Sequence, residues 1–222
     1  MNTEKQKKLI TAEEWETRLD QIPISRTQIN KLIINYLVSE GFQNAAEQFS
    51  KESSTELNLD ISLQARNQIR IAIVSGEIDK SIQLINDLDP NLLQEQPGLL
   101  FALRLQKLVT YIRENKISEA LAYGQEVLVP TAKGNPELLN ELEKALSLLA
   151  FSDIQESPLA EISSPAYKLK IASDVNAAIL KNKGKNQETT SLGQAFKVLE
   201  WTQKKLDKTV SFPKIALSEF KL

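Results

Sequence analysis

The chain has 222 residues, of which 41% are hydrophobic and 25% charged, a composition typical of a folded protein with its own core. Its 27 basic and 29 acidic residues leave a net charge of −2, so no excess positive charge favours nucleic acid or an anionic membrane. The chain contains no cysteine and no histidine. This excludes a disulfide, a zinc site built from thiolates and imidazoles, and a catalytic triad based on histidine.

The amino-terminal segment MNTEKQKKLITAEEW is charged throughout and lacks the apolar core of a secretory signal. No apolar run approaches the roughly 18 residues that a membrane-spanning helix needs. The absence of cysteine is compatible with a reducing compartment. We therefore expect an intracellular protein, in the cytoplasm, the nucleus or both.

Apolar residues recur at helical spacing along almost the whole chain, and we find no convincing alternating strand. The first helix signal is a capping box at Thr11 and Glu14, with Ile10 and Trp15 placed as the hydrophobic staple around it. We assign residues 1–24 to this helix and its extension.

A helical hairpin is predicted over residues 25–57, opened by a second capping box at Ser25 and Gln28. Gly41 suits the tight turn between its two helices. The helices carry more large apolar side chains than they can bury in each other, and burying each one stabilises by about 1.5–3 kcal/mol. We expect the hairpin to pair with a like hairpin on another chain, or else to pack on the rest of this chain. The residues expected in this interface are Ile29, Leu32, Ile33, Tyr36, Leu37, Gly41, Phe42, Ala46 and Phe49.

Glycine and proline mark the helix boundaries in the middle of the chain. Gly76 is the predicted C-cap of a helix that carries Ile69 and Ile73, and Pro97 is a predicted first-turn proline. We expect Pro130 to end another helix, because all eight prolines fall between the predicted helices or at their starts.

Three more helices are predicted in the last part of the chain. The pairs Asn-Pro at 135–136 and Ser-Pro at 164–165 each combine an N-cap with a first-turn proline, and Ser191 opens a capping box for the last helix. Residues 182–193 are expected to be a flexible insertion and residues 211–222 a tail. The predicted fold class is all-α, with antiparallel helical hairpins stacked as a solenoid-like array.

No group of residues suggests catalysis. Paired carboxylates such as Glu13 and Glu14 lie on polar helix faces, where a solvated surface is the simpler interpretation. Lys181, Lys183 and Lys185 lack the second glycine of a phosphate-binding loop. The two tryptophans and four tyrosines are spread singly and form no platform for stacking bases. We therefore expect no enzyme activity, no cofactor or metal, and no nucleic-acid or membrane partner.

Residues Ile29 to Glu52 follow the pattern IxxLIxxYLxxEGFxxAAExFxxE, which resembles the LisH dimerisation motif. Residues Ala65 to Arg113 resemble a CTLH domain, with a glycine after the first helix, a proline before a Leu-Leu pair, a Phe-x-Leu and a closing Ile-Arg. The later segments LLAF and VNAAIL resemble a CRA domain. The domains implied are LisH at 25–57, CTLH at 58–115 and CRA at 116–210.

This ordered triple covers the chain from about residue 11 to about residue 210. The resemblance implies a non-catalytic scaffold subunit of a multisubunit ubiquitin ligase of the CTLH (GID) type, supporting proteasomal degradation. The implied partners are other LisH–CTLH–CRA proteins, including subunits that carry a RING domain, in a homo- or hetero-oligomer. The alternative is an adaptor of a cytoskeletal or signalling assembly outside the ligase.

The resemblance implies two more surfaces. In the family the last helices return toward the LisH motif. A second partner face is expected in the middle of the chain around Arg104, Lys107 and Tyr111, although the segment FALRLQ from Phe101 departs there from the family's polar run, which leaves the choice of partner open. The residues expected to cover the LisH hairpin are Ile179, Leu180, Leu192, Phe196, Leu199 and Trp201.

Overall fold

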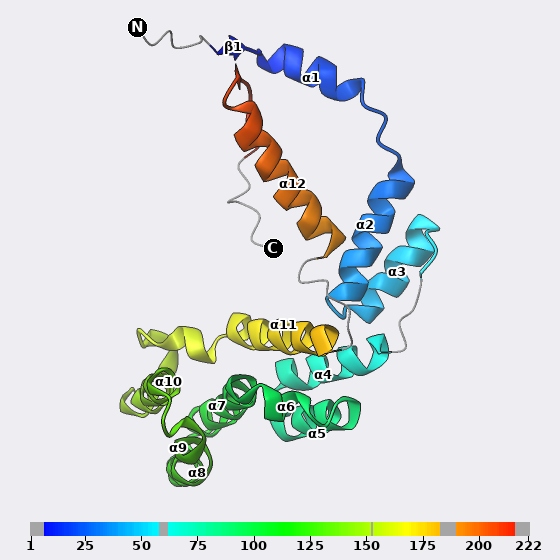
Figure 1. Cartoon of the computed structure of the whole chain (residues 1–222). Coiled ribbons are helices and arrows are strands. Elements are labelled where there is room, and N and C mark those ends of the chain that lie inside the picture. The colour runs from blue at the N-terminus through cyan, green and yellow to red at the C-terminus, as the bar shows by residue number, and fades with distance from the viewer. Residues whose placement is uncertain (1–6, 58–61, 152, 183–189, 216–222) are drawn as a thin grey trace, which may run out of the picture. The chain divides into compact units, whose positions relative to one another are not determined.

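The computed structural model describes residues 7–57, 62–151, 153–182 and 190–215, and most of the backbone in these ranges is helical (Figure 1). The predicted all-α fold class is confirmed. The chain divides into two compact units. The first unit comprises Met1–Ser39, Asn44–Asn58 and Glu188–Leu222, and the second comprises Glu40–Gln43 and Leu59–Gln187.

The first unit combines the two ends of the chain. α2 and α3 are the two helices of the predicted hairpin, and α12 packs against α2 (Figure 1). The helices of this unit are α1 (Ala12–Asp20), α2 (Arg26–Ser39), α3 (Gln43–Ser53) and α12 (Ser191–Leu206).

The first unit also contains two short strands. β1 (Lys8–Leu9) pairs in parallel with β2 (Val210–Ser211), where Lys8 aligns with Val210 and Leu9 with Ser211. We found no alternating strand pattern at these residues and did not predict these two strands. A two-residue strand is too short to show an alternating pattern, and its partner lies at the other end of the sequence.

The second unit is a stack of helices around two apolar clusters. One cluster lies between α4, α5, α6 and α11, the other between α7, α8 and α10, and α7 contributes Leu103 to the first and Phe101 to the second. The helical elements of this unit are α4 (Leu63–Ser75), α5 (Ile78–Leu88), α6 (Leu92–Glu95), α7 (Pro97–Arg113), α8 (Ile117–Tyr123), a π-helical segment (Gly124–Leu128), α9 (Val129–Ala132), α10 (Pro136–Ser147), three 3₁₀ segments (Leu148–Ala150, Ile154–Glu156, Ala160–Ser163) and α11 (Pro165–Asn182).

Several predicted helix ends are confirmed. The side-chain oxygen of Thr11 accepts a hydrogen bond from the backbone N–H of Glu14 at 3.2 Å. The side chain of Asn135 accepts two backbone N–H groups at the start of α10. Gly76 adopts the left-handed conformation, φ +85°, that ends α4, as the C-cap pattern predicts.

Pro130 does not end its helix, contrary to our prediction. α8 continues through the π-helical segment directly into α9, which contains the proline. Proline has no N–H, and its ring crowds the carbonyl group four residues earlier. A π-helical turn is wider than an α-helical turn and relieves this crowding, so the helix passes through the proline.

The N-cap of α12 is Thr190 rather than the predicted Ser191. The hydroxyl of Thr190 accepts the N–H of Gly193 at 3.0 Å, whereas the N–H of Ser191 donates to the side chain of Asn35 at 3.2 Å. Of the predicted flexible insertion, residues 183–189 lie outside the described residues, and 191–193 are helical.

Candidate protein–protein interface

The first unit buries few apolar side chains. Among its described residues, α1 and α12 contain no buried residue, α2 contains only Ile34 and α3 only Ala46. Both apolar clusters of the described chain belong to the second unit. Because apolar burial is the main favourable term in folding, the first unit gains little stability by itself.

Most of the predicted hairpin interface is only partly covered. Ile29 is 44% exposed, whereas Gly41 and Ala46 are buried. These last two have almost no exposed surface in the single chain, and their assignment to an intermolecular interface stays a prediction. Ile34, which is 7% exposed and lies beside the predicted stripe, was not among the predicted interface residues. The half-buried members of the predicted interface are Leu32, Ile33, Tyr36, Leu37, Phe42 and Phe49.

The turn between α2 and α3 belongs to the second unit, where it contacts α4 and α11. Arg66, 2% exposed, donates from Nη1 to Oδ1 of Asn176 at 2.7 Å. A Cβ atom at Gly41 would lie 3.3 Å from the same oxygen. The Arg70 guanidinium lies 4.1 Å from the centre of the Phe42 ring, a cation–π contact. This turn is therefore anchored within the chain.

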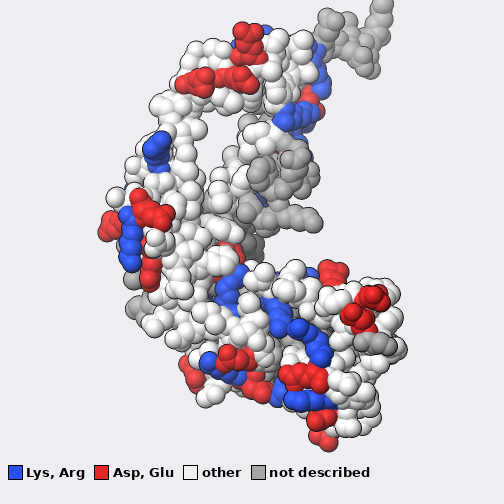
Figure 2. Space-filling view, turned by 180° about the vertical axis from the view of Figure 1, so that it is seen from behind, with Lys and Arg blue, Asp and Glu red and all other residues white. Residues whose placement is uncertain are grey.

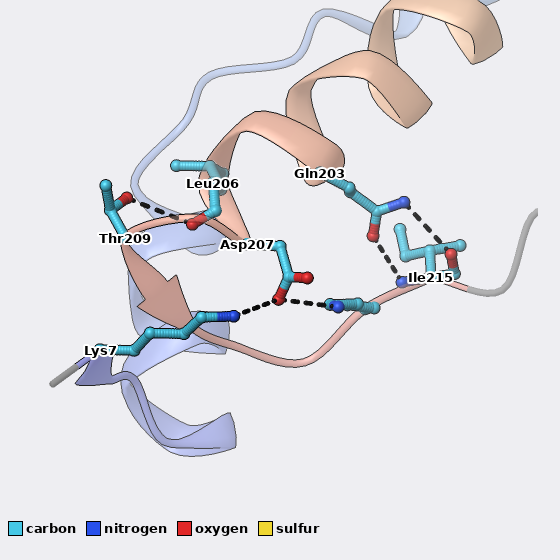
Figure 3. A network of polar contacts seen from close by, with 7 residues as sticks. Lys7, Gln203, Leu206, Asp207, Thr209 and Ile215 are labelled. Carbon is cyan, nitrogen blue, oxygen red and sulfur yellow. Dashed lines mark hydrogen bonds and ion pairs between the residues drawn. The ribbon is translucent and has the colours of Figure 1, made fainter. Parts of the chain in front are cut away.

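A polar network holds the residues that follow α12 (Figure 3). The carboxylate of Asp207 forms ion pairs with Lys214 at 2.9 Å and with Lys7 at 3.5 Å. The hydrogen bond from Lys214 is the main cause that holds the pKa of Asp207 below its ordinary value. The side chain of Gln203 accepts the N–H of Ile215 at 2.8 Å and donates to its carbonyl at 3.2 Å.

An aromatic contact joins the same two segments of the chain as the ion pair between Lys7 and Asp207. The rings of Trp15 and Phe212 are 5.1 Å apart between centroids, and Ile10 and Phe212 are each 8% exposed. Trp15 therefore packs on the far end of the chain. We call the residues Lys7–Ile10, Trp15, Gln203, Asp207 and Val210–Ile215 the terminal clasp. The start of the predicted tail, 211–215, is part of it.

The six residues predicted to cover the LisH hairpin lie in different environments. Ile179 is 1% exposed and lies in the apolar cluster between α4, α5, α6 and α11, so packing in this cluster accounts for its apolar side chain. Its assignment to the surface that covers the hairpin stays a prediction. A buried helix face cannot be distinguished from a surface stripe by apolar spacing alone. Leu180, the next residue, is half-buried.

The remaining members of that face lie on α12. Leu192, Phe196 and Leu199 are half-buried on this helix, which packs against α2. Trp201 is 60% exposed, and the ammonium group of Lys205 lies 5.2 Å from its ring centre. An exposed tryptophan is a frequent anchor of protein interfaces.

In the predicted second partner face, Lys107 and Arg104 contact other residues of the second unit. Lys107 forms an ion pair with Asp79 at 2.7 Å and lies 5.2 Å from the ring of Tyr123 and 5.9 Å from that of Tyr111. Burial, the largest single influence, lowers the pKa of Lys107, but the hydrogen bond and charge of Asp79 together raise it above its ordinary value. Arg104 donates to the hydroxyl of Thr131 at 3.4 Å. The side chains of Lys107 and Arg104 therefore bind other groups of this chain.

Comparison with known proteins decides the family. A LisH family model matches residues 27–53, and the model of the CTLH/CRA domain C-terminal to the LisH motif matches residues 62–207. The chain is 41% identical over 211 residues to the glucose-induced degradation protein 8 homologue of Dictyostelium discoideum, covering 95% of this chain and 92% of that protein. The chain belongs to the glucose-induced degradation protein 8 family.

Other similar members of this family come from a plant and a yeast. The GID8 homologue of Arabidopsis thaliana is 38% identical, covering 94% of this chain and 86% of that protein. The GID complex subunit 8 of Schizosaccharomyces pombe is 32% identical, covering 82% of this chain and 80% of that protein. The resemblance to LisH and CTLH proteins is therefore confirmed.

The family models cover the two units unequally. The LisH match spans α2 and α3, and the CTLH match spans α4 to α12. β1, α1 and β2 lie outside both matches. Within the described ranges, no three potential metal-ligating side chains come together, and no helix has the length and apolar character needed to cross a membrane.

Proposed function

We propose that the chain is a non-catalytic scaffold subunit of a multisubunit GID/CTLH-type ubiquitin ligase. In this role it bridges other subunits through its LisH, CTLH and CRA helices and so supports ubiquitin- and proteasome-dependent degradation. Its partners are other LisH–CTLH–CRA proteins, including RING-bearing subunits, and it works in the cytoplasm and the nucleus.

The observation that carries the proposal is the family match over nearly the whole chain, since the yeast relative is named as a GID complex subunit. The first unit supports it physically. Its helices bury almost nothing within the described chain, so apolar surface on α2 and α3 remains for a partner. Stable protein interfaces bury roughly 800 Å² per partner, which a helical hairpin with a return helix can supply.

A second role fits the same interface. An adaptor in a cytoskeletal or signalling assembly outside the ligase would use the same helices. The match to Ran-binding protein 9 of Xenopus tropicalis, 26% identical over 107 residues, covers 45% of this chain and 20% of that protein, so related segments also occur within a longer protein.

Affinity purification of the full chain from its native cells, followed by quantitative mass spectrometry, tests the proposal. We expect a RING-bearing LisH–CTLH–CRA protein at a fixed ratio to the chain, and ligase output that falls when the chain is removed. Purification without such a protein favours the adaptor role. Unchanged ligase output in the absence of the chain contradicts the scaffold role.

Two double variants of α2 test whether its half-buried face binds the partner. Ile33→Glu with Leu37→Glu places two charges on the half-buried face of α2, where burying an unpaired charge is costly. The control is Thr27→Glu with Gln28→Glu, which adds the same charge to the exposed start of the same helix. We expect partner loss in the first pair only, with helical circular dichroism retained. Loss of helicity in the first pair would mean that this face is the chain's own core.

A further inference from the structure

A cavity of about 390 Å³ lies in the second unit where α7 ends. It lies between the turn from α7 to α8 and the 3₁₀ segments that follow α10. Ligand sites in proteins span roughly 300–1,000 Å³, so this space suits one large side chain with its adjoining backbone. The side chains that line its apolar part are Ile112, Ile117, Leu148, Leu149, Phe151 and Ile154.

Two sequence segments that carry the family resemblance meet at this cavity. They are Ile112-Arg113, which closes the CTLH pattern, and LLAF at 148–151. Ile112 and Leu148 are 7% and 0% exposed, so packing accounts for them. Phe151 is 39% exposed and Arg113 is also exposed, so the core does not account for either.

The rim of the cavity offers uncommitted donors. Among the described residues, the side chains of Arg113 and Asn115 make no ion pair or hydrogen bond. The acidic residue of the rim, Asp153, already accepts the N–H of Gln155 at 2.8 Å. Asn115 has a left-handed backbone, φ +56°, and lines the cavity at the turn.

Lys168 on α11 is another cation of the second unit. The ammonium group of Lys168 would lie 3.4 Å from a Cβ atom at Gly76, so this group lies beside the end of α4. Burial chiefly, and then the positive charge of Arg113, lower the pKa of Lys168. No described carboxylate forms an ion pair with Lys168 or Arg113. A carboxylate from outside would therefore supply the ion pair that Arg113 lacks at the rim of the cavity.

We propose that the cavity binds a short linear segment of another protein in which a large apolar side chain adjoins a carboxylate. The apolar side chain enters the space between Ile112, Leu148 and Ile154, and the carboxylate pairs with Arg113. The amide of Asn115 is placed to bond the segment's backbone. This site shares no residue with the predicted hairpin interface and does not depend on ligase membership.

Fluorescence anisotropy on the full chain tests this with labelled, end-capped hexapeptides. The probe is GSFDEG, and the controls are GSFKKG, which reverses the charge, and GSADEG, which removes the large side chain. We expect GSFDEG to bind at least ten times more tightly than either control. No binding of GSFDEG at about 1 mM, the weak limit of specific association, overturns the proposal.

Two variants assign the binding to the cavity. Arg113→Glu should weaken GSFDEG at least tenfold and improve GSFKKG. Lys116→Glu, a matched charge reversal at an exposed lysine that pairs with Glu114, should change binding less than twofold. Equal effects of the two variants contradict the site. If GSADEG binds as well as GSFDEG and inorganic phosphate displaces both, the cations form an anion site only, and the proposal fails.

Discussion

Arg66 on α4 and Asn176 on α11 are joined by a 2.7 Å hydrogen bond inside the second unit, where they are only 2% and 7% exposed. A buried charge is destabilising unless neighbouring groups satisfy it. Nε of Arg66 also donates to the hydroxyl of Ser62 at 3.4 Å. These contacts hold α4 against α11 next to the turn that contains Gly41.

Replacing Asn176 with leucine should destabilise the protein by about 3 kcal/mol, because the variant keeps the volume but removes an acceptor from the buried Arg66 charge. Chemical denaturation measures the change. Asn140→Leu, on the exposed face of α10, is the control and should change stability by less than about 0.5 kcal/mol. Adding Arg66→Met to Asn176→Leu should restore part of the loss; a further loss would contradict the role of the unpaired charge.

Replacing Gly41 with alanine should cost about 1–2 kcal/mol of folding stability. Its φ of +79° is unfavourable for alanine, and the added Cβ would lie 3.3 Å from Oδ1 of Asn176. Gly98→Ala is the matched control, since Gly98 lies in the first turn of α7 with open space around it. The control should be neutral or slightly stabilising in thermal unfolding. Equal melting temperatures for the two variants would refute this account.

Replacing Phe212 with alanine should release α1 without unfolding the second unit, because Trp15 loses its aromatic partner while both apolar clusters remain. The measurement is the fluorescence of Trp15 in a Trp201→Phe background, with hydrogen exchange of residues 8–20. Ile215→Ala, at a residue that is 51% exposed, is the control. Unchanged exchange in α1 after Phe212→Ala would show that the ring contact does not hold this helix.

The terminal clasp should loosen in acid. The pKa of Asp207 is lowered in the folded chain, chiefly by the hydrogen bond from Lys214, so the open form binds the proton more readily. The contribution of Asp207 is therefore complete above its ordinary pKa, about 4, and is lost as the pH falls through the lower folded value. Trp15 fluorescence followed from pH 6 downward should report the opening, and Asp207→Asn should remove this pH dependence. The same transition in the variant would assign it to other carboxylates.

The sequence by itself determined the helical fold class, several helix ends and the family resemblance. These depend on local chemistry, as in the cap of Asn135 and the left-handed Gly76, and on spacing patterns that a single chain displays. Even so, Pro130 and Ser191 show that a π-helical turn or a neighbouring hydroxyl can move a boundary that the local pattern predicts.

Only the tertiary structure decided which apolar residues are buried and which polar residues are paired. Ile179 and Trp201 follow similar helical spacing, yet one is 1% exposed and the other 60%. The contacts of Trp15 with Phe212 and of Arg66 with Asn176 join residues far apart in the sequence. Periodicity specifies a face of a helix, whereas burial depends on what packs against that face, and that neighbour comes from a distant part of the chain.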